Sequence, residues 1–285
     1  MAVSASRIAS RQIANLVFAG FCILFTAFAL AALAAILWSL ASQGIGGVNL
    51  AILTQDTPSA GSTGGGLRNA IVGSILMGVE AMSIAIVVGV LAGTWLAEYS
   101  GQSRYGSLIR FLNDVLLSAP SILVGLFVYQ LLVERMIGHF SGIAGGVALA
   151  LIAAPVITRT TEDVLNLQPT ALRESGIALG TPVWTVTRSI LWRAAGSGML
   201  TGILLAFARI SGETAPLLFT ALGNLNFSTD MMRPMANLPK VIFDFALSAD
   251  DNWRRLAWVG SLLIASTVLA ITIIARAFAK EPNRS

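Results

Sequence analysis

Three ionisable residues stand out in this sequence because each lies inside a long apolar stretch. They are Glu80, Arg209 and Glu213. A charge at the centre of a membrane helix costs about 2.5–3.5 kcal/mol on insertion scales, so each charge needs a reason to be there. The guanidinium group of Arg209 carries several donors in a fork that fits the oxygens of an oxyanion. We therefore expect these three residues to line a path for an anion.

Arg209 and Glu213 are four residues apart, a spacing that places both side chains on one face of a helix. A structural ion pair that neutralises both charges is therefore the alternative to an anion path. Pro216 cannot donate a helical hydrogen bond, and together with Gly212 it predicts a break or bend beside the two charges. At about 1.5 Å per residue, these charges and Glu80 can share the middle-to-outer half of one bundle.

The elements that must position these residues are membrane helices. Of the 285 residues, 55% are hydrophobic and only 11% are charged, whereas soluble domains carry about 25% charged residues. Apolar runs near the ~20 residues that span the hydrocarbon predict an all-α polytopic membrane protein, a single domain over 1–285. We expect about six transmembrane helices, at 13–40, 69–97, 108–133, 142–160, 195–222 and 256–278.

Lysine and arginine residues indicate the orientation, because cytoplasmic segments of membrane proteins carry an excess of them. With the N terminus inside, eleven of the eighteen Lys and Arg residues fall in cytoplasmic segments. Both termini are then cytoplasmic, the polar segment 161–194 is a cytoplasmic loop, and the loop 223–255 lies outside. Glu98 and Asp114 fall near cytoplasmic helix ends, where Asp114 can pair with Arg110 one turn away.

The segment 161–194 is expected to contain two short helices. Pro169 can open the first helix and Gly180 can end it in a left-handed cap, after which Thr181 can cap the second. The first helix mixes exposed charge with apolar residues at helical spacing. Such a helix can dock in a groove on a soluble partner, or it can lie on the lipid surface.

The sequence argues against several other kinds of chemistry. A single cysteine, Cys22, and a single histidine, His139, cannot supply an internal disulfide or a usual zinc site. Neither Lys240 nor Lys280 follows a glycine-rich phosphate-binding turn, so ATP chemistry must come from another chain. Basic residues are scattered between apolar runs, which fits loops beside anionic lipid rather than nucleic-acid binding. We expect no enzyme activity, metal or cofactor in this chain.

The segment 161–194 resembles the coupling loop of ABC-importer permeases. That loop has a glutamate followed by small residues, then a glycine and, further on, an isoleucine. Here the pattern is carried by Glu174, Ser175, Gly176, Gly180 and Ile190. The Leu-Pro close that is usual in the family is missing, because Trp192 and Arg193 stand in its place. The resemblance implies that this loop contacts an ATPase subunit.

A more extensive resemblance, from Gly64 onward, is to the A-type permease subunits of phosphate importers. The most specific stretch is 208–221, and further similar stretches are 65–74, 119–127 and 237–258. The resemblance implies the fold of type I ABC importer permeases, in a bacterial inner membrane. It also implies inorganic phosphate as the substrate, a second homologous permease subunit, two ATPase subunits that bind the ATP, and a periplasmic phosphate-binding protein.

Three alternatives stay open at this point. The chain could serve another oxyanion such as sulfate or molybdate, it could be a secondary transporter driven by an ion gradient, or it could be a membrane scaffold or intramembrane enzyme. Glu213 or Glu80 could accept a hydrogen bond from the proton that phosphate carries and sulfate lacks. Selection could instead occur mainly in the binding protein.

Overall fold

The computed structural model describes residues 5–101 and 103–279, so Lys280 lies outside the described residues. The described chain is built from helices joined by loops. Three short 3-10 or π-helical segments are at Ile45–Gly47, Tyr129–Ile137 and Thr187–Leu191. The α-helices are α1 (Ala5–Gly44), α2 (Ala51–Thr54), α3 (Arg68–Glu98), α4 (Arg104–Ser118), α5 (Ser121–Val128), α6 (Gly142–Asn166), α7 (Thr170–Ala178), α8 (Val183–Val186), α9 (Trp192–Ala194), α10 (Gly196–Ser211), α11 (Ala215–Thr220), α12 (Leu238–Ala246) and α13 (Asp251–Ala279).

Four helices are long and apolar enough to cross a membrane, namely α1, α3, α6 and α13. Two further spans are bent. One joins α4 to the helix Ser121–Ile137 at 107°, and the other joins Val183–Ala194 to α10 at 74°. The described residues therefore provide four to six candidate spans, which agrees with the six expected from the apolar runs.

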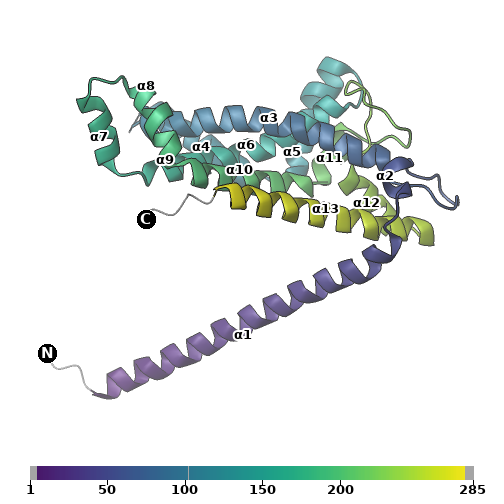
Figure 1. The fold of residues 1–285 in the computed structure, drawn as a ribbon, viewed down its shortest axis with the longest axis horizontal. Coiled ribbons are helices and arrows are strands. Elements are labelled where there is room, and N and C mark those ends of the chain that lie inside the picture. The colour runs from purple at the N-terminus through teal and green to yellow at the C-terminus, as the bar shows by residue number, and fades with distance from the viewer. Residues whose placement is uncertain (1–4, 102, 280–285) are drawn as a thin grey trace.

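The long helices form an elongated bundle in which α3, α6, α10 and α13 run lengthwise (Figure 1). The helices α7 and α8 lie at one end, here called the α7 end, and α2 and α12 lie at the other, here called the α12 end. α1 leaves the bundle beside α13 and projects away from it. The N-terminal end of α1 and the C-terminal end of α13 both lie toward the α7 end, as expected if both termini share one side of a membrane.

Close packing at glycines holds the centre of the bundle together. A Cβ atom added to Gly89 would lie 2.7 Å from the Ile157 side chain, and one added to Gly93 would lie 2.5 Å from the Thr158 carbonyl oxygen. The sequence 89–93 therefore lets α3 approach α6 closely. Gly202 does the same for α10, where an added Cβ would lie 2.5 Å from Thr160 on α6.

The third and fifth predicted spans are broken rather than continuous. The expected helix 108–133 bends by 107° between α4 and α5, where Ala119 is extended, with φ −66° and ψ 134°. Pro120 explains this bend, because a proline disfavours the helical conformation of the residue before it. The expected helix 195–222 is interrupted between α10 and α11. Composition and length alone predicted a continuous third helix, and that expectation is wrong, whereas the interruption of the fifth helix is the break that Gly212 and Pro216 predicted.

The region 223–255 is more structured than a plain loop. It contains α12, whose first turn is capped by the Asn237 side chain accepting from the Lys240 backbone N–H at 2.9 Å. Its last five residues already belong to α13, which begins at Asp251 rather than near Leu256. Backbone hydrogen bonds join this region to the start of α6, for example from Ile143 N–H to the Met231 carbonyl oxygen at 3.0 Å.

Asn69 holds the α12 end together. Its side-chain oxygen accepts from the Thr57 N–H at 3.1 Å, and its amide donates to the Thr57 hydroxyl at 2.8 Å. The same amide donates to the backbone oxygens of Asn224 at 2.9 Å and Leu225 at 3.0 Å. Asn69 is 2% exposed, so its loss would leave buried polar groups without partners.

We expect Asn69→Leu to lower the stability of the folded chain. Removing one partner from buried hydrogen bonds costs about 1–3 kcal/mol, which corresponds to a fall in melting temperature of about 5 °C. Thermal unfolding of the purified protein in detergent measures this. Asn226→Leu is the matched control, because Asn226 is exposed and should tolerate the change. Equal melting temperatures for the two variants would contradict the role given to Asn69.

Candidate functional site

Arg209 and Glu213 lie on either side of a helix end. Arg209 is in the last turn of α10, which ends at Ser211, and α11 begins at Ala215. Glu213 lies in the interruption and donates its backbone N–H to the Ile210 carbonyl oxygen at 3.2 Å. The two side chains therefore do not share one continuous helix face, contrary to the expectation from their spacing.

The Arg209 side chain is not neutralised by a carboxylate of the described chain. Among the described residues, no ion pair and no side-chain hydrogen bond involves either Arg209 or Glu213. Arg209 is exposed, whereas Glu213 is half-buried. A cation in the last turn of a helix is favoured by the helix dipole. The arrangement thus keeps a positive group available at the surface of the bundle.

The break beside Arg209 packs directly on the other bent span. Pro216, buried at the start of α11, lies against Gly125 of α5. A Cβ atom on Gly125 would be 2.6 Å from the Pro216 Cα, so only a glycine fits without displacement of backbone. The two interrupted spans therefore pack on each other through α5 and α11, and a movement of either one must be accommodated by the other.

Glu80 is half-buried, on the face of α3 that packs on α6. A Cβ atom on Gly146 of α6 would lie 2.1 Å from the Glu80 Oε2 atom, so the glycine makes room for the carboxyl group. That oxygen is buried and has no hydrogen-bond partner among the described residues. A buried polar atom without a partner is costly, and such atoms in native proteins call for an explanation.

Glu80 and the α10–α11 break border the same core. The core cluster includes Met77, one turn from Glu80, together with Ile210 of α10 and Leu217 of α11. The neighbouring Gly145 packs against Met77, Leu217 and Ala221. Within the described chain, however, no hydrogen bond or ion pair joins Glu80 to Arg209 or Glu213. The structure brings the three residues into one region without direct contact.

The segment 161–194 folds into short helices at the α7 end. α6 extends to Asn166, and α7 follows after Pro169. Gly180 adopts φ +74°, and its N–H donates to the Ile177 carbonyl oxygen at 2.9 Å. The second helix begins one residue later than expected, because Pro182 rather than Thr181 is its N-cap.

The residues of the coupling-loop pattern occupy two faces of this segment. Glu174, Ser175 and Gly180 are exposed, whereas Gly176 is buried. A Cβ atom on Gly176 would lie 2.7 Å from Val186 and 3.4 Å from Ile190, so this glycine lets the two short helices pack together. On the outer face, the side chains of Ile177 and Leu179 are 53% and 84% exposed. Exposed charge beside exposed apolar side chains fits a surface that docks on a soluble partner.

Two ion pairs at the α7 end were not found by sequence reasoning. Arg110 of α4 donates to Glu162 of α6 at 2.6 Å, so the expected pairing of Arg110 with Asp114 is wrong. Asp114 instead approaches Arg159 of α6 at 3.8 Å. The Arg110 side chain points to the neighbouring helix, and a one-turn spacing along a single helix could not reveal this.

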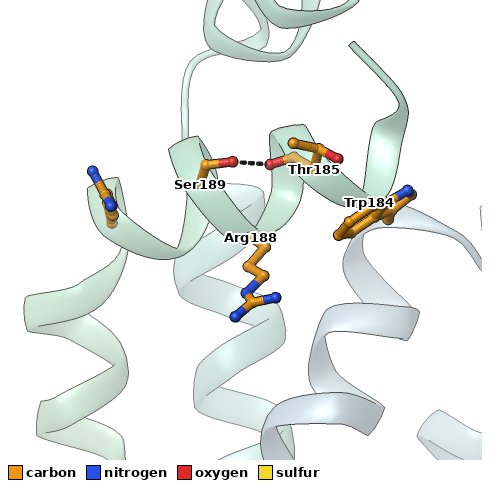
Figure 2. Close-up of a pocket in the computed structure, with 5 residues that line it drawn as sticks. Trp184, Thr185, Arg188 and Ser189 are labelled. Atoms are coloured by element: carbon orange, nitrogen blue, oxygen red, sulfur yellow. Dashed lines mark hydrogen bonds between the residues drawn. The ribbon is translucent and has the colours of Figure 1, made fainter.

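Two hollows lie on the surface of the segment 161–194, and Arg209 lines neither of them. One, of about 290 Å³, is lined by Trp184, Thr185, Arg188, Ser189 and Arg193. Figure 2 shows Arg188 pointing away from the side that carries the Ser189 hydroxyl, which donates to the Thr185 carbonyl oxygen. The other hollow shares Trp184 and Arg188 and is also lined by Trp95, Tyr99 and Trp192. Aromatic and basic side chains together are typical of a membrane–water interface.

Four to six candidate membrane spans, two of them bent, and a polar segment of short helices at one end of the bundle are the features of an integral membrane protein of the transporter type. Residues 85–282 match the family model described as "Binding-protein-dependent transport system inner membrane component". The chain belongs to this family, whose members are transport subunits and not enzymes.

Relatives and a solved structure agree with the assignment. The chain is 53% identical to the protein named "Phosphate transport system permease protein PstA" of Yersinia pestis, with 87% of this chain and 84% of the relative covered. It is 50% identical to the protein of the same name of Pasteurella multocida, with 87% and 88% covered. A chain of the MetNI methionine ABC transporter in an inward-facing conformation has a TM-score of 0.62 at 18% identity, with 76% of this chain and 96% of that chain covered. The fold is that of type I ABC importer permeases.

Proposed function

We propose that this chain is the transmembrane permease subunit of an ATP-driven importer of inorganic phosphate. The observation that carries the proposal is Arg209, an exposed guanidinium at a helix break with no carboxylate partner among the described residues. Relatives about 50% identical over most of the chain carry a phosphate-transport name, which supports phosphate over sulfate or molybdate.

In this proposal the chain forms half of the translocation path. A second homologous permease subunit forms the other half, two ATPase subunits bind ATP at the α7 end, and a periplasmic phosphate-binding protein delivers phosphate at the α12 end. The α7 end then faces the cytoplasm of a bacterial cell, across its inner membrane, and the chain itself needs no cofactor. The excess of Lys and Arg in the segments assigned to the cytoplasm supports this orientation.

The mechanism is alternating access without covalent chemistry in this chain. ATP binding changes the preferred position of the coupling surface around Glu174 and Gly180, and the bundle re-packs because the ATPase has a different affinity for its two states. Phosphate passes the break at Gly212 and Pro216, where the Arg209 fork can bind its oxygens. Glu213 or Glu80 is proposed to accept a hydrogen bond from the proton that phosphate carries, which disfavours sulfate because sulfate has no such proton.

The proposal is tested by uptake of labelled phosphate in cells from which this gene is deleted and then restored. High-affinity phosphate uptake should require the gene, and an excess of unlabelled sulfate should not compete. An ATPase subunit should copurify with the tagged chain. Uptake that is competed by sulfate would favour a different oxyanion, and phosphate uptake that persists without ATP hydrolysis would favour an ion-gradient-driven transporter.

A further inference from the structure

Within the part of the chain that the structure describes, one ion pair joins the coupling helix α7 to the membrane bundle. Arg173 of α7 donates to Glu98 through Nη2 at 2.6 Å and through Nε at 2.9 Å, which is a two-pronged contact. The Glu98 side chain is only 6% exposed and that of Arg173 is 23% exposed. A bidentate ion pair with one buried partner holds a more fixed geometry than an exposed ion pair.

The same guanidinium also caps α6. Arg173 Nη1 donates to the Gln168 carbonyl oxygen at 2.8 Å, and Nη2 donates to the Leu165 carbonyl oxygen at 2.7 Å. Carbonyl groups at a helix C terminus lack partners within the helix and accept such hydrogen bonds readily. One side chain of α7 therefore holds the ends of both α3 and α6.

In the proposed mechanism, movement of α7 must reach the transmembrane helices, and α3 and α6 are the two that Arg173 contacts. Glu98 is the last residue of α3, a continuous helix of 31 residues that also carries Glu80. α3 packs closely on α6 through Gly89 and Gly93. A displacement of Glu98 is therefore transmitted along α3, a continuous helix roughly 46 Å long at ~1.5 Å per residue.

A second ion pair connects the ends of α3, α4 and α6. Arg110 of α4, which is paired with Glu162 of α6, also donates to the Leu96 carbonyl oxygen at 3.0 Å and to the Ser100 hydroxyl at 3.1 Å. Leu96 and Ser100 lie at the end of α3. The ends of α3, α4 and α6 are thus fixed to one another, and Arg173 joins α7 to these three helices through its ion pair with Glu98.

We propose that Arg173 and Glu98 form the mechanical joint through which movement of the coupling helix α7 reaches the transmembrane bundle. This inference rests on the proposed function, because the movement must come from an ATPase bound to the exposed face of α7. Arg173 points toward α3 and α6, and Glu174 and Ser175 are exposed. Docking of the ATPase and transmission of its movement are therefore performed by different residues, and Arg173 is a positioning residue.

The test uses the whole complex purified with its ATPase and reconstituted in vesicles, with phosphate uptake and ATP hydrolysis measured in the same sample. The variants are Arg173→Gln, Glu98→Gln, the double variant, and the charge swap Glu98→Arg with Arg173→Glu. Arg104→Gln is the matched control, because Arg104 lies at the start of α4, outside the segment 161–194, is exposed and has no ion pair among the described residues.

We expect Arg173→Gln and Glu98→Gln to retain the ATPase and continue to hydrolyse ATP, but to transport about tenfold less phosphate per ATP hydrolysed. The double variant should transport no less phosphate per ATP than either single variant, because both single variants remove the same contact. The charge swap should recover part of the lost ratio of phosphate to ATP, and Arg104→Gln should keep the wild-type ratio. A residue with only a structural role would lower the amount of complex without changing phosphate moved per ATP.

Three results would overturn the joint. They are an unchanged ratio in Arg173→Gln, loss of the bound ATPase in that variant, or additive losses in the double variant. If neither single variant accumulates, the charge swap decides the question. Phosphate transport per ATP that is still about tenfold below wild type in the charge swap opposes the joint, and a ratio near wild type supports it. Absence of ATP-dependent phosphate uptake in the wild-type complex would instead refute the proposed function.

Discussion

Arg209→Gln is expected to reduce phosphate uptake by about 100-fold, the effect of losing charge-assisted hydrogen bonds to a bound anion. Glutamine keeps the length and polarity of the side chain but removes the positive charge and the two-pronged fork. Because Arg209 is exposed and without an ion-pair partner among the described residues, its removal leaves no buried carboxylate uncompensated. The complex should therefore assemble normally, and initial rates of labelled phosphate uptake in cells measure the loss.

Two further variants separate the path from other roles of the arginine. Arg209→Lys keeps the charge but loses the fork, so uptake should fall by less than in Arg209→Gln. Arg233→Gln is the control, because Arg233 has a side chain that is 76% exposed and lies in the region 223–255. Normal uptake by an assembled Arg209→Gln complex would show that the arginine serves the helix end and not the anion.

Gly180→Val is expected to reduce the amount of ATPase that copurifies by about tenfold, because a β-branched residue at positive φ costs of the order of 1–3 kcal/mol. Gly180 ends the coupling helix at φ +74°, with its N–H bonded to the Ile177 carbonyl oxygen. Adding a β-branched side chain there forces the turn to open and moves the exposed docking face around Ile177 and Leu179. Uptake should fall in parallel.

Gly180→Asn is the matched control for this prediction. Asparagine tolerates the left-handed conformation, so it should retain most of the bound ATPase. No atom lies within 4 Å of a Cβ added to Gly180, which means that steric contact cannot explain a difference between the two variants. Equal ATPase retention by the valine and asparagine variants would show that the conformation of this turn does not determine docking.

The parts of the fold that follow from local sequence could be predicted. Apolar runs long enough to cross a membrane located α1, α3, α6 and α13, because burial in lipid depends mainly on the composition of each run. The left-handed end of α7 could be predicted from Gly180, since few other residues adopt that conformation. The four-residue spacing of Gly89 and Gly93 indicates a close helix approach, but only the structure shows that the partner is α6.

The parts that depend on partners distant in sequence could not be predicted. Arg110 has a carboxylate one turn away on its own helix, yet it pairs with Glu162 on α6, 52 residues further on. Glu98 was expected only to lie near a cytoplasmic helix end, but its side chain is 6% exposed and pairs with Arg173 of α7. The break beside Arg209 was predicted from Gly212 and Pro216, whereas the exposure of Arg209 depends on which helices pack beside α10. Spacing along one helix cannot report which helix packs beside it.

The most direct test of the anion path uses the fact that Cys22 is the only cysteine of the chain. In a Cys22→Ser background, Arg209→Cys should abolish ATP-dependent phosphate uptake by the reconstituted complex. Treatment with the cationic reagent aminoethyl methanethiosulfonate should then restore part of the uptake, and the anionic sulfonatoethyl reagent should not. If neither reagent reacts with the variant in any nucleotide state, or if both restore uptake equally, position 209 does not serve the passing anion through its charge.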